Sequence, residues 1–199
     1  MLNKKLLPIL AVGVAMALGC FGCAAAPAPA PAPAPAPRHV ILFIGDGMGT
    51  EQVRAAGMYA YGEEGTLFFE RFPIHTLIAT NSADGAVPDS AAAGTAISAG
   101  RIVRNRVLNR AIPGDGSNLQ TLVEYFHKHG KVAGLVTTSY VTDATPAAFY
   151  AHADQRGDFN DIAADLLYKT RPKVIMGGNR HISLDEARAA GYAVVTDRE

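Results

Sequence analysis

Cysteine is scarce in this 199-residue sequence, since the only two are Cys20 and Cys23. The chain after Cys23 therefore has no disulfide, which excludes a small disulfide-stapled domain. Neither sign of charge is in excess, because 18 Lys and Arg residues balance 18 Asp and Glu residues. Without a basic field, nucleic acid is not an expected partner. With 49% hydrophobic residues, the chain is expected to form a globular core rather than remain disordered.

Long apolar runs are also lacking. Leu6–Leu18 is shorter than the roughly 20 residues of a membrane span, and it follows two lysines, as in an export signal. The Ala-Leu-Gly-Cys sequence that ends at Cys20 resembles a bacterial lipobox, in which cleavage leaves a lipidated cysteine. Cys23 is a second candidate, and an ordinary cleaved signal with incidental cysteines is the alternative. We predict a lipoprotein-type signal peptide at 1–20, contact with a membrane through the lipid anchor, and a periplasmic or cell-envelope location.

Residues 21–37 form a predicted linker that ends in an alanine–proline repeat. Proline at every second position disfavours helix and sheet and favours an extended polyproline II conformation. This segment is expected to hold a folded domain, residues 38–199, away from a membrane surface.

Apolar runs rich in β-branched residues alternate with segments of helical spacing in the predicted domain. We expect strands at 40–44, 132–138, 174–176 and 192–195, and helices at 50–61, 119–129, 159–168 and 184–190, with Thr50 and Ser117 as caps. This alternation is typical of an α/β fold with a mostly parallel central sheet and helices on both faces. Ligands of such folds bind at the C-terminal ends of the strands, where Asp46 lies.

Asp46 lies between glycines in the loop Gly45–Gly49. A dinucleotide fingerprint would need a further glycine at position 50, which is threonine here. A glycine-flanked carboxylate at a strand end suits a hard metal ion, because the backbone can turn sharply and leave the carboxylate exposed. A simple turn residue is the alternative interpretation.

Ser90 begins a run of small residues that extends to Ala96 and is expected to form a closely packed helix. A serine at a helix N-terminus lies among free N–H groups and positive potential, which stabilise an alkoxide and bind a phosphate. Alternatively, Asp89 or Ser90 is only a helix cap and the alanines only pack. Taken alone, this segment favours the second interpretation.

Asp143 and Thr145 follow the predicted strand 132–138, and they offer oxygen ligands suited to magnesium or its waters. Arg156, a little further on, could bind a phosphate through two N–H groups. Turn, cap and surface roles are the alternatives for these three residues.

Together, the three segments resemble the alkaline phosphatase family in order and in local sequence. The matching stretches are Ile44–Gly49, Pro88–Ala96, Asp143–Ala148 with His152 and Arg156, and Ile175–Arg180. The resemblance implies hydrolysis of phosphomonoesters through a phosphoserine, with two zinc ions and one magnesium ion per site. It also allows a homodimer.

The resemblance assigns a role to each matching residue. It implies that Ser90 is the nucleophile, Asp46 bridges a zinc site and the magnesium site, and Thr145 binds magnesium. It further implies that Asp143 orients magnesium-bound water and that Arg156 holds two phosphate oxygens.

The family's remaining ligands are missing from this sequence, which has neither Asp-x-x-x-His nor Asp-His. Its six histidines are therefore expected to be structural or solvated, with His181 solvated after a turn. We expect the chain to be the N-terminal part of an alkaline phosphatase domain whose fold is incomplete at the C-terminus, and to have negligible activity alone. The alternative is a non-catalytic exported lipoprotein fragment or pseudoenzyme that lacks the zinc ligands.

Overall fold

The structure is a computed structural model that describes residues 39–79, 81–85 and 87–196. The predicted signal peptide, the lipidation candidates Cys20 and Cys23, and the linker 21–37 lie outside these residues and stay predictions. Among the helices described, none combines the length and the apolar character needed to cross a membrane. The chain divides into a short unit that ends at Phe43 and a larger one, Ile44–Glu199.

The described elements are mostly helices, with two strands among them. In chain order they are α2 (Thr50–Tyr61), η1 (Phe68–Arg71), α3 (Ser90–Ala99), α4 (Leu122–Lys128), β1 (Gly134–Tyr140), α5 (Ala144–Ala147), α6 (Phe159–Ala164), the π-helical turn η2 (Asp165–Thr170), β2 (Val174–Gly178) and α7 (Leu184–Ala189).

Two of the four predicted strands are wrong. Residues 40–44 form no strand, and their apolar side chains are exposed, with Ile41 at 78% and Phe43 at 88%. Residues 192–195 are likewise irregular, and Val195 is exposed. An apolar run becomes a strand only where a neighbouring strand accepts its backbone hydrogen bonds, and neither segment has such a ladder in the described chain.

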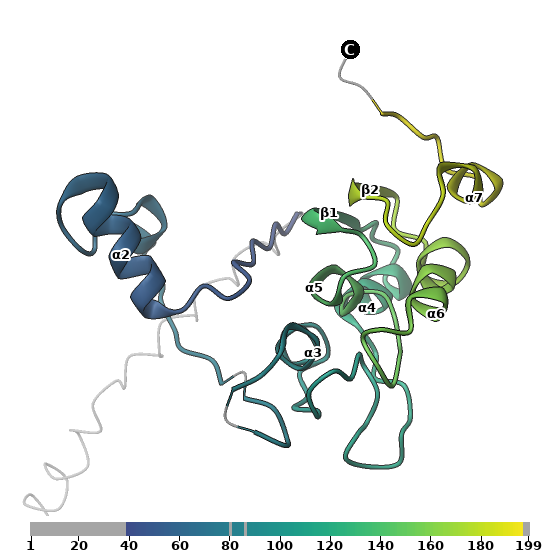
Figure 1. The fold of residues 1–199 in the computed structure, drawn as a ribbon, viewed down its shortest axis with the longest axis horizontal. Coiled ribbons are helices and arrows are strands. Elements are labelled where there is room, and N and C mark those ends of the chain that lie inside the picture. Colours follow the sequence, from purple (N-terminus) through teal and green to yellow (C-terminus); the bar gives the residue numbers. More distant parts are fainter. Residues whose placement is uncertain (1–38, 80, 86, 197–199) are drawn as a thin grey trace, which may run out of the picture. The chain divides into compact units, whose positions relative to one another are not determined.

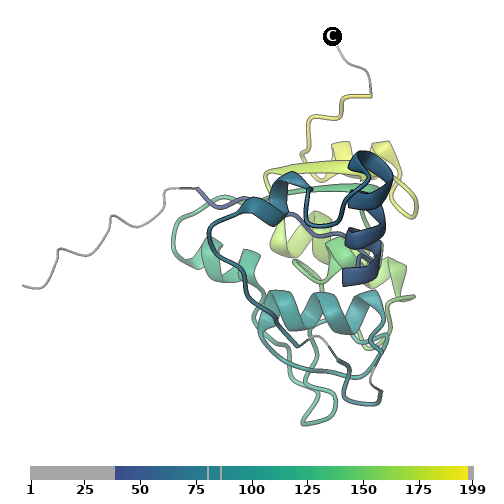
Figure 2. The same cartoon turned by 90° about the vertical axis from the view of Figure 1, so that its left-hand side faces the viewer.

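The other two strands form a parallel pair, as predicted. Gly134 of β1 lies opposite Val174 of β2, and the two strands run side by side in Figures 1 and 2. The expectation of helices on both faces is wrong for the described residues. Leu135 and Ile175 pack on the core, whereas Val136 on the opposite face is 75% exposed. The run is apolar on both faces, so its sequence could not show that only one face would be covered.

Helix boundaries follow local capping. Helix α2 has the predicted bounds, but Gly49 rather than Thr50 is its N-cap. Helix α4 begins later than predicted, because the Thr121 hydroxyl accepts a hydrogen bond from the N–H of Glu124 (3.2 Å) and the Glu124 carboxylate accepts one from the N–H of Thr121 (2.9 Å). Ser117 instead bonds Asp115 in a turn.

Helices α3 and α5 pack closely through small side chains, as the run after Ser90 predicts. A Cβ atom on Gly94 would lie only 2.7 Å from the Cβ of Ala148. The core below this contact includes the fully buried Leu108, Tyr150 and Ile162. The contact therefore fixes the helix that begins at Ser90 against the segment that carries Asp143 and Thr145.

Candidate active site

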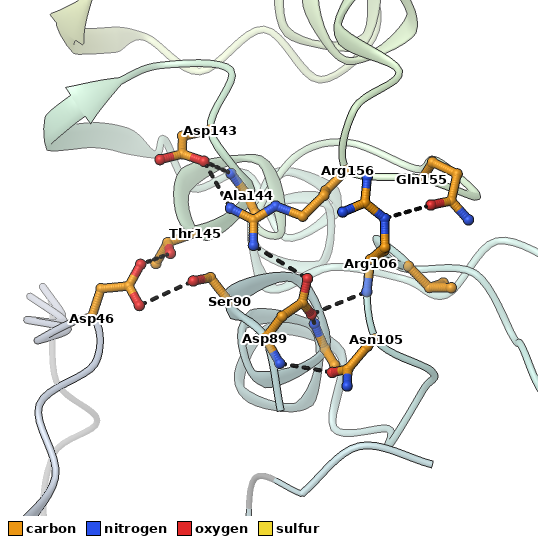
Figure 3. Close-up of polar contacts among 12 residues, drawn as sticks. Asp46, Asp89, Ser90, Asn105, Arg106, Asp143, Ala144, Thr145, Gln155 and Arg156 are labelled. Carbon is orange, nitrogen blue, oxygen red and sulfur yellow. Dashed lines mark hydrogen bonds and ion pairs between the residues drawn. The ribbon is translucent and has the colours of Figure 1, made fainter. Parts of the chain in front are cut away.

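Ser90 is the first residue of α3, and Asp89 is its N-cap. Asp89 Oδ1 accepts a hydrogen bond from the N–H of Ala92 at 3.0 Å, so the capping interpretation is right for Asp89. The Ser90 hydroxyl is not used for capping. It donates instead to Asp46 Oδ1 at 3.1 Å (Figure 3). The helix N-terminus thus presents a serine oxygen toward a carboxylate.

Asp46 joins two of the other predicted residues. Its second oxygen, Oδ2, accepts a hydrogen bond from the Thr145 hydroxyl at 2.6 Å. The loop can turn here because Gly47 has a left-handed backbone with φ of 68°. Three oxygen-bearing side chains from three separate segments, Asp46, Ser90 and Thr145, therefore meet at one place (Figure 3).

The chemistry of this oxygen cluster fits magnesium better than zinc. Carboxylate and hydroxyl oxygens are hard ligands of the kind that magnesium binds, whereas zinc sites usually include histidine or cysteine. The described residues contain no group of three or more His, Cys, Asp or Glu side chains that could hold a metal ion. Within the part of the chain that the structure describes, Asp46, Ser90 and Thr145 offer oxygen ligands of the kind that magnesium binds, and no histidine or cysteine joins them.

Arg156 lies beside this cluster and bonds two carboxylates. Its Nη1 is 3.2 Å from Asp89 Oδ2, and its Nη2 is 3.1 Å from Asp143 Oδ1. Burial lowers the pKa of Arg156, but the charges and hydrogen bonds of Asp89 and Asp143 outweigh it and raise the pKa above its usual value. The guanidinium is therefore charged, and each terminal nitrogen keeps a second N–H for another acceptor.

Asp143 is the N-cap of α5 and has a full set of donors. Its Oδ1 accepts from the N–H of Ala144 (2.8 Å) and its Oδ2 from the Ser139 hydroxyl (2.8 Å). Burial raises the pKa of Asp143, but these hydrogen bonds and the charge of Arg156 more than compensate and leave the pKa lowered. Asp143 does not contact Asp46 directly in this arrangement, and it is connected to the cluster through Arg156 and Asp89.

Two residues that support Asp89 were not expected from sequence patterns. Asn105 Oδ1 accepts a hydrogen bond from the Asp89 N–H at 2.7 Å. The Arg106 N–H donates to Asp89 Oδ1 at 3.0 Å, and the Arg106 carbonyl accepts from the Arg156 N–H at 2.6 Å. The two bonds of Arg106 are made by its backbone, which is left-handed with φ of 72°. No sequence pattern predicts this conformation for an arginine.

The histidines stay outside the cluster. His152 is half-buried, with one ring nitrogen 2.9 Å from the Leu119 carbonyl oxygen. His181 is exposed, as predicted, although its ring also stacks on Phe159 at a centroid distance of 3.9 Å. Both positions agree with the structural or solvated roles expected for them.

Comparisons with known proteins point to one family. The sequence profile described as alkaline phosphatase matches residues 37–196. Alkaline phosphatase 3 of Bacillus subtilis (strain 168) is 33% identical over 98% of this chain and 46% of its own length. Streptomycin-6-phosphate phosphatase of Streptomyces griseus is also 33% identical, over 81% of this chain and 44% of its own length.

Solved structures show the same likeness. Alkaline phosphatase from the Antarctic bacterium TAB5 matches with a TM-score of 0.66 and 28% identity, over 77% of this chain and 46% of that one. Cold-active alkaline phosphatase from Shewanella sp. matches with a TM-score of 0.67 and 32% identity, over 77% of this chain and 40% of that one. A structure of a TAB5 variant has Mg bound in its M3 site.

The fold is thus one part of an alkaline-phosphatase-like α/β architecture. The chain belongs to the alkaline phosphatase family. It spans less than half the length of each of the relatives named above.

Proposed function

We propose that this chain carries the nucleophile and the phosphate-binding arginine of a phosphomonoester hydrolase that works through a phosphoserine at Ser90. The observation that carries the proposal is the meeting of Ser90, Asp46 and Thr145 at the N-terminus of α3, with Arg156 alongside. Family membership and the names of the relatives, one of which is a streptomycin-6-phosphate phosphatase, support the same substrate class.

Phosphate binding is assigned to Arg156 and the first turn of α3. The helix has ten residues, and its N-terminus presents positive potential and free N–H groups where Ser90 begins it. Arg156 offers the second N–H of each terminal nitrogen to two phosphate oxygens. Asp89 and Asp143 hold the guanidinium in place while leaving these donors available.

The reaction has two steps. The Ser90 hydroxyl loses its proton to solvent as Oγ forms a bond to phosphorus, the bond from phosphorus to the leaving oxygen breaks, and the leaving oxygen takes up a proton to become an alcohol. Water then attacks the phosphoserine, which releases inorganic phosphate and restores the Ser90 hydroxyl. Before the first step, the hydrogen bond to Asp46 Oδ1 orients Ser90 Oγ (3.1 Å). During both steps, Arg156 offsets negative charge on the transferred group.

Metal binding is proposed for the same oxygens. Asp46 and Thr145 would hold magnesium, Asp46 would also face zinc, and Asp143 would orient a magnesium-bound water. Bound metal would supply Lewis-acid stabilisation of the serine and leaving oxygens. Among the described residues, no further His, Cys, Asp or Glu side chains gather into a group that would complete a zinc site.

The test is to trap the phosphoserine. The protein expressed from its complete gene is incubated with a radiolabelled phosphomonoester, zinc and magnesium, quenched in acid and mapped by peptide mass spectrometry. Label is expected on Ser90 and is expected to vanish in Ser90→Ala. The matched control is Ser98→Ala, which removes a buried hydroxyl from the same helix and should keep the label. Steady-state turnover that survives Ser90→Ala unchanged would refute the nucleophile assignment, and absence of turnover in the wild type would favour a non-catalytic protein.

A further inference from the structure

Beneath the site, Asn109 links the helix that carries Ser90 to the segment between Thr145 and Arg156. Asn109 is fully buried, and its side-chain amide donates to the carbonyl oxygens of Ala148 and Ala151, both at 2.7 Å. Its backbone N–H donates to the Thr95 hydroxyl of α3 at 3.1 Å. One residue is therefore bonded to both of the segments that bring the site together.

The two carbonyl groups that Asn109 binds need a partner. Ala148 is the C-cap of α5, and Ala151 follows it, so their carbonyl oxygens come at the end of a helix, where intrahelical partners run out. The Asn109 amide supplies the missing donors. The chain then runs five residues further to Arg156, so the amide fixes the point from which the Arg156 loop departs.

Two features of Asn109, its backbone conformation and its side-chain oxygen, are unfavourable in free energy. Its φ of 48° is a left-handed value that glycine adopts without strain. Its Oδ1 is buried and accepts no hydrogen bond from the residues that the structure describes. A larger residue with a strained backbone and an unpaired oxygen is unfavourable here unless its two N–H donations compensate.

We propose that Asn109 is a positioning residue for the phosphoryl transfer proposed above, on which this inference rests. By bonding α3 and the end of α5 at once, it fixes Ser90 relative to Arg156. Displacement of one group by about 1 Å lowers turnover by as much as roughly 100-fold. Loss of the amide is therefore expected to lower kcat about 10- to 100-fold, with a smaller change in KM.

The deciding variant is Asn109→Gly, in the protein expressed from its complete gene. Glycine adopts the left-handed backbone without strain and removes the side chain with its amide. If the amide positions the site, kcat falls and the backbone amides of residues 144–152 exchange with deuterium faster. If the position only needs a left-handed residue, the variant matches or exceeds the wild type in both measurements, and the proposal is wrong. The matched control is Arg171→Gly, a second non-glycine residue with positive φ (50°), at the end of η2 and outside the site. It should keep the wild-type kcat.

A second pair of variants tests the α3 side of the link in case Asn109→Gly does not fold. Thr95→Val removes the hydroxyl that accepts the Asn109 N–H, whereas Thr95→Ser keeps it. A fall in kcat in the valine variant with recovery in the serine variant supports the proposal, and equal kcat values in the two overturn it.

Turnover and labelling of the wild type separate failure of this proposal from failure of the proposed function. A wild-type protein that neither labels Ser90 nor turns over phosphomonoesters contradicts both, even where Asn109→Gly speeds exchange. An active wild type whose kcat and exchange are unchanged by Asn109→Gly contradicts the positioning role alone.

Discussion

The two sides of the candidate site are held in place by different means. On the Arg156 side, Asp89 and Asp143 are partly buried, and each also accepts a backbone N–H at the start of a helix. On the other side, Asp46 lies in an exposed loop, followed by a helix, α2, whose only buried residue is Gly57. The hydroxyls of Ser90 and Thr145 join Asp46 to the rest of the site.

This difference in burial implies that substitutions on the two sides affect stability and activity differently. When a partner is removed from a partly buried network, the groups left behind lose hydrogen bonds that water replaces incompletely. When a partner is removed from an exposed carboxylate, water replaces it. Substitutions on the Arg156 side should therefore lower both stability and activity, whereas substitutions at Asp46 should lower activity alone.

The largest expected effect is on activity, from Asp46→Ala. This change removes the carboxylate that receives Ser90 and Thr145 and that would bind magnesium, so kcat/KM should fall by about 100-fold or more. The melting temperature should stay near that of the wild type. Magnesium binding measured by calorimetry should weaken in parallel, and Asp46→Asn, which keeps the shape but loses the charge, should weaken it as well.

A melting temperature that falls strongly in Asp46→Ala would contradict the comparison, because it would show that the exposed loop contributes to the stability of the fold. Unchanged turnover and magnesium binding would instead contradict the role proposed for Asp46.

The second effect is on stability, from Asp89→Ala. The substitution removes the N-cap of α3 and the acceptor for Arg156 and for the N–H of Arg106. A lost cap costs about 1 kcal/mol, and unpaired buried partners cost about 1–3 kcal/mol more. The free energy of unfolding, from urea denaturation, should therefore fall by about 2–4 kcal/mol. Asp89→Asn keeps an acceptor for both N–H groups and should lose less.

A fall in the free energy of unfolding of less than about 0.5 kcal/mol in Asp89→Ala would match an ordinary surface substitution. It would show that the contacts on the Arg156 side stabilise the fold no more than those on the Asp46 side.

The same comparison explains what could be predicted from the sequence. Helices α2 and α3 were predictable because glycine, aspartate and small residues mark their ends locally. The parallel pairing of β1 and β2 followed from the alternation of strands and helices. The absence of a strand at 40–44 was not predictable in the same way, because strand formation depends on a distant partner strand as well as on the apolar run itself.

The residues of the candidate site also differ in whether a local sequence pattern indicates them. Asp46, Ser90, Thr145 and Arg156 were proposed because their short motifs, taken in order, resemble one family, whereas each motif alone left a cap, turn or surface role open. Asn109 was missed, because its role rests on a left-handed backbone and on carbonyl groups about 40 residues away. Contacts of that kind involve main-chain atoms, which every residue has, so they leave no pattern in side-chain types.

A smaller effect is expected from Gly94→Ala, which tests how tightly α3 holds against α5. The added Cβ would approach Ala148 Cβ to 2.7 Å, so the helices must separate slightly. Overpacking costs about 1–3 kcal/mol, and the better helix propensity of alanine returns up to about 1 kcal/mol. Urea denaturation should show a net loss of about 1–2 kcal/mol, with a larger loss for Gly94→Val. A stabilised Gly94→Ala variant would show that this contact is loose.

The smallest effect concerns pH and the half-buried His152, four residues before Arg156. Burial lowers the pKa of His152, but Asp165, the Leu119 carbonyl and Glu124 raise it by more, so the net pKa is above its usual value. Asp165 is itself paired with Lys169 at 2.6 Å, which keeps it ionised beside His152.

A raised pKa means that the folded state binds the His152 proton more tightly than the unfolded state does. The contribution of His152 to stability is therefore complete below the unfolded pKa of about 6.5, and it is lost as the pH rises through the higher folded value. The free energy of unfolding of the wild type, relative to His152→Gln, should be highest in acid and decline across this range. Asp165→Asn should flatten the same decline, because it removes the carboxylate that favours the charged imidazole. A wild-type advantage that grows with pH would have the opposite sign, and would mean that burial rather than Asp165 and Glu124 governs this histidine.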